Sequence, residues 1–139
     1  MEQSVLQALG PPLNPVWRMI QPGKSIRTFI GSKDFEESCR FYEMLEFEIR
    51  HHGKGFAYIN ISPGIGFYLQ DAYVKDWCEN MMLFLEVDDL PAYFNKITAL
   101  DLPSNFPGVK VMPIKHQDWG SEFFIIEPAG VLWHIGCFK

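Results

Sequence analysis

The chain has 139 residues, with 47% hydrophobic residues, 21% charged residues and a formal net charge of −5. These values are ordinary for a single folded domain. The negative net charge disfavours nucleic acids and anionic membranes as partners, and it is compatible with a neutral or cationic small-molecule ligand. The three cysteines form no CxxC pair and no signal peptide or long apolar run is evident, which together predict a reduced cytoplasmic protein without a disulfide framework.

The first predicted segments are an N-terminal arm over residues 1–24 and a domain over residues 25–139. The arm carries prolines and a glycine that interrupt regular structure: Pro11, Pro12, Pro15, Pro22 and Gly23. Residues 26–31 then alternate like a strand, and Asp34 precedes a helical repeat as its N-cap. Three further strands are expected over residues 47–52, 56–61 and 66–70, separated by glycine-containing turns.

The same order of elements returns in the second half of the chain. The stretch "MMLFLEVDDLPAYFNKITAL" (81–100) reads as a strand, a capping aspartate and a helix with proline in its first turn. Asp34 aligns with Asp89 and Leu45 with Leu100, a period of 55 residues. Strands over 109–114, 122–127 and 131–136 complete the pattern. The fold class is therefore predicted as α+β, with two tandem βαβββ modules (25–75 and 80–138) that form a cupped mixed sheet.

Three motifs carry a family resemblance over residues 25–138. They are "SKDFEESCRFYEMLEFEI" (32–49), "LEVDDL" (85–90) and "WGSEFFIIEPAGVLWHI" (119–135), with Glu127 where an aspartate is usual. The chain resembles the glyoxalase, bleomycin-resistance and extradiol-dioxygenase superfamily, called vicinal oxygen chelate proteins, and within it the bleomycin-resistance proteins most of all. One fold hosts unrelated chemistries, so the function needs an argument from the residues themselves.

The resemblance implies four metal-ligand positions, which can be counted from the motifs. They fall on Arg27, Tyr68, Met82 and His134, with Tyr68 defined to within one residue. Only His134 is an ordinary ligand for a divalent metal, and an arginine stays protonated and repels a cation. We therefore expect neither a metal nor another cofactor, and no catalytic residue.

Strand alternation from these positions predicts a concave face that is aromatic with scattered polar groups, opposite an aliphatic face for the core. Such a face suits a planar organic molecule. For Trp119, in the loop before the final hairpin, packing as a plug against Met112 or Phe106 is an equal alternative. The candidate ligand-binding residues are Arg27, Phe29, Phe56, Tyr58, Tyr68, Gln70, Met82, Phe84, Trp119, Glu122, Phe124 and His134.

The predicted function is metal-independent sequestration of a planar, cationic drug or metabolite, as in antibiotic resistance, by a homodimer that completes each pocket. Two alternatives remain open. One is a glyoxalase-like lyase or dioxygenase-type metalloenzyme with non-standard ligands. The other is a non-catalytic module that binds a protein partner.

Overall fold

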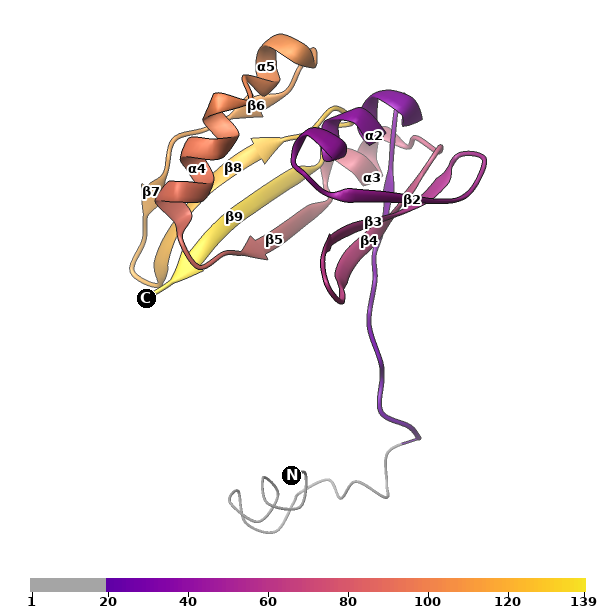
Figure 1. Cartoon of the computed structure of the whole chain (residues 1–139), viewed down its shortest axis with the longest axis horizontal. Helices are drawn as coiled ribbons and strands as arrows, with labels where there is room; N and C mark the ends of the chain where they lie inside the picture. Colours follow the sequence, from indigo (N-terminus) through magenta and orange to yellow (C-terminus); the bar gives the residue numbers. More distant parts are fainter. Residues whose placement is uncertain (1–19) are drawn as a thin grey trace.

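The computed structural model describes residues 20–139. Most of the predicted N-terminal arm, residues 1–24, therefore lies outside the described residues. Residues 20–28 form no helix or strand, and in Figure 1 they run as an extended indigo trace into the body of the molecule, where the first strand begins at Phe29.

The first module folds into one mixed four-stranded sheet with helices beside it. Its strands are ordered β1-β4-β3-β2, with β1 parallel to β4 and the other pairs antiparallel. In the strand register, Tyr68 of β4 lies opposite Phe29 of β1 on one edge of the strand and opposite Tyr58 of β3 on the other edge. The elements are β1 (Phe29–Gly31), α2 (Phe35–Met44), β2 (Glu48–Gly53), β3 (Phe56–Ser62), β4 (Ile65–Gln70) and α3 (Lys75–Glu79).

The second module repeats this topology in a second mixed sheet, ordered β5-β9-β8-β6 with β7 also paired to β8. The prediction of tandem βαβββ modules is thus confirmed, and the structure divides the predicted sheet into two, one for each module (Figure 1). The elements are β5 (Met82–Glu86), α4 (Leu90–Ala99), α5 (Leu102–Asn105), β6 (Lys110–Val111), β7 (Lys115–His116), β8 (Gly120–Ile126) and β9 (Leu132–Phe138).

Local differences from the sequence prediction occur where elements are short. The strand expected over residues 109–114 is split into β6 and β7, with Pro113 between them, because proline has no N–H for a ladder hydrogen bond. The short helices α3 and α5 were not predicted, and Cys78 lies buried in α3.

The two long helices begin at equivalent aspartates, as the 55-residue period predicts. Asp34 Oδ1 accepts a hydrogen bond from the Glu37 N–H at 3.1 Å, and Asp89 Oδ1 accepts one from the Ala92 N–H at 3.0 Å. Each of these helices, α2 and α4, has ten residues. Among residues 20–139, no helix is long and apolar enough to cross a lipid bilayer.

A single hydrophobic core joins the two modules. The Tyr42 ring of α2 lies 5.0 Å from the Phe67 ring of β4 and 6.0 Å from the Trp133 ring of β9, so one helix contacts both sheets. The aliphatic face predicted from strand alternation supplies much of this core. Its buried members are Ile30, Ile59, Phe67, Leu69 and Ile135, and its half-buried members are Ile61, Leu83, Leu85 and Val87.

Candidate ligand-binding site

The structure groups eleven of the twelve predicted site residues into two clusters, one on each sheet. We call the cluster on the first sheet the first wall: Arg27, Phe29, Phe56, Tyr58 and Tyr68. The cluster on the second sheet is the second wall: Met82, Phe84, Trp119, Glu122, Phe124 and His134. The twelfth residue, Gln70, lies opposite Phe56 in the strand register, at the edge of the first wall.

Three stacked rings form the surface of the first wall. Phe29 and Tyr68 are direct neighbours on the parallel strands β1 and β4, with ring centroids 5.0 Å apart. Phe56 on β3 continues the stack, with its ring 5.2 Å from that of Tyr68 and inclined by 18°. The three stacked rings form one continuous aromatic surface on this side of the sheet, which suits contact with a planar organic ligand.

A guanidinium group lies on this aromatic surface. The Arg27 Cζ is 4.4 Å from the centroid of the Tyr58 ring, within the range of a cation–π contact, and Arg27 Nη1 donates a hydrogen bond to Tyr68 Oη at 2.9 Å. Tyr58 itself is buried beneath Arg27. Gly66 makes room for it, because a Cβ atom at that position would collide with the Tyr58 hydroxyl and the Ile59 carbonyl oxygen.

His134 is the centre of the second wall. Its Nδ1 lies 2.9 Å from Oε1 of Glu122, whose exposed fraction is 7%, and its Nε2 lies 3.5 Å from the sulfur of Met82. The imidazole meets the Phe124 ring edge-on at 4.7 Å and is stacked with the Phe84 ring at 6.3 Å. The carboxylate thus fixes the orientation of the imidazole between two aromatic rings.

Trp119 belongs to the second wall and does not plug the core. Its ring lies 5.8 Å from that of Phe84 and 5.3 Å from that of Phe138, and its exposed fraction is 38%. Phe106, one partner in the alternative interpretation, packs instead against Phe41 at 5.5 Å. Phe138 was missed from the sequence, although continuing the alternation of β9 from His134 by two steps would have found it.

The four counted metal-ligand positions meet in pairs, one pair on each wall. Arg27 contacts Tyr68, and Met82 contacts His134. A guanidinium, a phenol, a thioether and one imidazole do not match the donor set of a divalent metal site. Within the described part of the chain, no three His, Cys, Asp or Glu side chains cluster in a metal-binding arrangement. These residues therefore do not fit the divalent metal that the resemblance implies, and we derive no chemistry through one.

An open groove runs between the two sheets. Its volume is about 490 Å³, and it is lined by Arg27 and Thr28 before β1, by Phe84 and Leu85 of β5, and by further residues of β3, β4 and β9. This volume is in the range of small-molecule sites. Arg27 of the first wall and Phe84 of the second wall thus border the same hollow.

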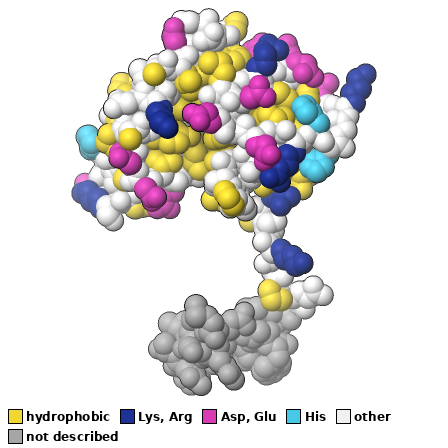
Figure 2. All heavy atoms as spheres, viewed as in Figure 1, with side chains coloured by type: hydrophobic (Ala, Val, Ile, Leu, Met, Phe, Trp, Pro, Cys, Tyr) yellow, Lys and Arg dark blue, Asp and Glu magenta, His cyan; other side chains and the backbone are white. Residues whose placement is uncertain are grey.

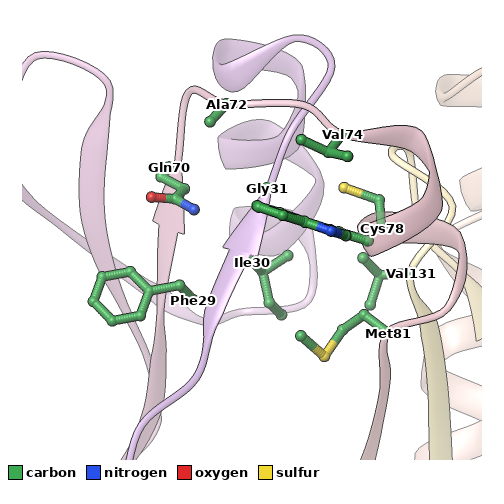
Figure 3. Close-up of a pocket in the computed structure, with 10 residues that line it drawn as sticks. Phe29, Ile30, Gly31, Gln70, Ala72, Val74, Cys78, Met81 and Val131 are labelled. Carbon is green, nitrogen blue, oxygen red and sulfur yellow. The ribbon is translucent and has the colours of Figure 1, made fainter.

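A smaller apolar cavity of about 200 Å³ lies at the end of β1. Figure 3 shows Phe29 and Gln70 on one side of this strand, and Ile30, Met81 and Val131 on the other. Only Phe29 and Gln70 among the predicted site residues line it. It therefore adjoins the first wall without containing its stacked rings.

The thiol of Cys78, which lines this cavity, and the thiol of Cys39 in α2 are unsuited to nucleophilic catalysis. Burial raises the pKa of the Cys39 thiol to about 11, and burial also raises the pKa of the Cys78 thiol. A thiol with a raised pKa stays protonated near neutral pH, and the thiolate is the reactive form. Both cysteines are accordingly part of the core.

Glu127, at the position where the resemblance leads us to expect an aspartate, has a structural role. Its Oε1 accepts hydrogen bonds from the backbone N–H groups of Ala129 at 2.6 Å and Val131 at 3.0 Å, which fixes the turn between β8 and β9. The Tyr42 hydroxyl donates to its Oε2 at 2.9 Å, and the Trp133 indole N–H donates to the Tyr42 oxygen at 3.2 Å. Burial raises the pKa of the Glu127 carboxyl to about 7.

This architecture is the fold of the glyoxalase, bleomycin-resistance and extradiol-dioxygenase proteins, as the sequence motifs predicted. Bleomycin-binding protein from Streptomyces verticillus, complexed with copper(II)-bleomycin, superposes with a TM-score of 0.71 at 19% identity over 87% of this chain and 100% of that chain. The antibiotic-binding protein TnmS3 from a Streptomyces species gives 0.66 at 18% identity over 87% of this chain and 99% of that chain.

A glyoxalase/bleomycin-resistance protein from Catenulispora acidiphila gives a TM-score of 0.64 at 17% identity over 83% of this chain and 98% of that chain. No family model and no curated protein matches the sequence. The chain therefore shares its fold with proteins that bind bleomycin and other antibiotics, and its ligand has to be argued from its own side chains.

Proposed function

We propose that this protein binds a planar aromatic molecule between the first and second walls and sequesters it without chemical change. The observation that carries this proposal is the pair of aromatic surfaces, one on each of the two sheets, each with only a few polar groups. Stacking supplies affinity for any flat molecule, and the polar groups orient it. The fold that the chain shares with bleomycin- and antibiotic-binding proteins supports the same function.

We further propose that a second copy of the chain completes each pocket. Among residues 20–139, no aromatic contact joins a ring of the first wall to a ring of the second. Met82 and Phe84 on β5 keep exposed fractions of 62% and 44%, and Figure 2 shows hydrophobic side chains gathered across the middle of one face. Apolar surface of this kind favours association, and a two-fold symmetric pairing would create two equivalent pockets.

A cationic group of the ligand is best placed at the second wall. Glu122 lies in this wall, and Glu86 follows Phe84 on the same face of β5 with its side chain exposed. Asp118 adjoins Trp119 in the chain and is also exposed. Carboxylates and the π-face of an indole both attract a cation, so this wall is where the proposed positive charge belongs.

Replacement of Trp119 by alanine is expected to weaken the binding of bleomycin by about 1–3 kcal/mol, roughly five- to hundred-fold, because an indole face is lost. The melting temperature should change little, since Trp119 lies at the surface of the second wall. Titration calorimetry and a thermal melt of both proteins measure these effects. Trp77→Ala is the matched control, because that indole belongs to neither wall; equal affinity of all three proteins would remove Trp119 from the site.

The protein is expected to be a dimer of twice the 16.1 kDa chain mass at micromolar concentration, with one ligand bound per chain. Sedimentation equilibrium measures the mass, and calorimetric titration gives the stoichiometry. A monomer at these concentrations, with or without ligand, would contradict the proposed composite pocket.

A further inference from the structure

We infer that the first wall receives an anionic group of the ligand, such as an aromatic carboxylate, and that Arg27 is the residue that recognises it. This inference rests on the proposed function and specifies the ligand class for one half of the site. It assigns opposite charges to the two walls, with a cation at the second wall and an anion at the first.

The position of Arg27 is fixed by the aromatic wall. Its guanidinium lies over Tyr58 at 4.4 Å and also 5.6 Å from the centroid of the Tyr68 ring, and one nitrogen is bonded to the Tyr68 hydroxyl. Only one of the five guanidinium N–H donors is used in this hydrogen bond. The remaining donors are held on a side chain that is exposed at the groove. A guanidinium fixed in this way is prepared for bidentate recognition of a carboxylate.

The charge of Arg27 is not balanced by a neighbouring acid in the described structure. The nearby Arg50, whose Cζ lies 5.9 Å from the Tyr58 ring, is paired with Glu48 at 2.7 Å. Across residues 20–139, no carboxylate lies within ion-pair distance of Arg27.

The same geometry disfavours a cationic ligand on the first wall. The faces of Tyr58 and Tyr68 that would attract a cation are already in contact with Arg27. A ligand cation would therefore have to displace the guanidinium or lie beside it, and like charges at such distances repel. An aromatic anion meets neither obstacle: its ring stacks on the Phe29–Tyr68–Phe56 series, and its charge reaches Arg27.

The experiment compares three probes with the same flat ring system and different charge: pyrene-1-carboxylate, 1-pyrenemethanol and 1-pyrenemethylamine. Each is titrated by fluorescence into the full chain and into the Arg27→Gln and Arg50→Gln variants. The carboxylate is expected to bind the Arg27→Gln variant at least ten-fold more weakly than the original protein, while Arg50→Gln changes its affinity less than two-fold. Arg27→Gln should leave the affinity for the ammonium probe equal or higher.

The outcomes separate this inference from the proposed function. If the original protein binds none of the three probes, the proposed function falls and the inference falls with it. If all three bind and Arg27→Gln weakens them alike, the aromatic pocket stands and the charge assignment is overturned. Arg27→Lys tests the guanidinium geometry in addition, since it keeps the charge without the planar fork; melting temperatures of all variants exclude unfolding as the cause of a loss.

Discussion

Replacement of Trp133 by alanine is expected to lower the free energy of unfolding by about 3–5 kcal/mol. The Trp133 side chain is 3% exposed and lies on β9, where its ring is 5.4 Å from Phe67 of the first sheet. It also donates a hydrogen bond to Tyr42 of α2. The substitution removes a large buried ring at the junction of the two modules and leaves the Tyr42 oxygen without this donor, so both cavity formation and a lost hydrogen bond destabilise the protein.

Chemical denaturation followed by circular dichroism measures this effect. Trp77→Ala is the control, because the Trp77 side chain is 74% exposed and should alter stability by less than about 0.5 kcal/mol. Because the other residues of the shared core still join the two modules, we expect the variant to unfold in one transition, like the original protein. Two separate transitions would show that each module holds its own core, contrary to the shared core described above.

The second large effect is a pH dependence of stability that originates from Glu127. The pKa of this carboxyl is raised by burial from 4.5 to about 7 in the folded protein, so folding favours the protonated form. The resulting stabilisation is fully present below pH 4.5 and is lost as the pH rises through about 7. A pKa shift of this size corresponds to a change of about 3 kcal/mol in the free energy of unfolding.

Glu127→Gln isolates this contribution from the titration of all other groups. The amide has the same size and no charge at any pH, so the stability of the variant relative to the original protein should increase by about 3 kcal/mol between pH 4.5 and pH 8. Urea denaturation of both proteins at several pH values gives the difference curve. Parallel pH profiles for the two proteins would contradict a buried, neutral Glu127 in the folded state.

The module repeat could be predicted because its signals are local. Asp34 and Asp89 each cap a helix through a backbone N–H three residues later, and this contact depends only on the adjacent sequence. The alternation of β3, β4 and β9 separates core from surface for the same reason, since successive side chains of a strand point to opposite faces. Short elements were missed where local signals are weak, as at α3 and α5.

The sequence could predict which residues share an aromatic surface, but it could not predict how those residues are arranged. Strand alternation assigned Phe29, Tyr68, Phe84 and His134 to the aromatic face opposite the core. Each of them lies in one of the two walls. The hydrogen bonds from Arg27 to Tyr68 and between Glu122 and His134 depend on strand pairing between segments 41 and 12 residues apart. A pattern in the sequence does not contain these distances.

What the sequence by itself determined is therefore the α+β class, the two modules, the helix caps and which side of each strand faces the core. These follow from hydrophobic periodicity and capping, which act over a few residues. Only the tertiary structure decided that the candidate residues form two walls on separate sheets, that Arg27 lies on the rings of the first wall, and that Glu127 is buried against Tyr42. These features arise because the shared core brings remote segments together. The burial of a side chain and the effect of its charge depend on those neighbours.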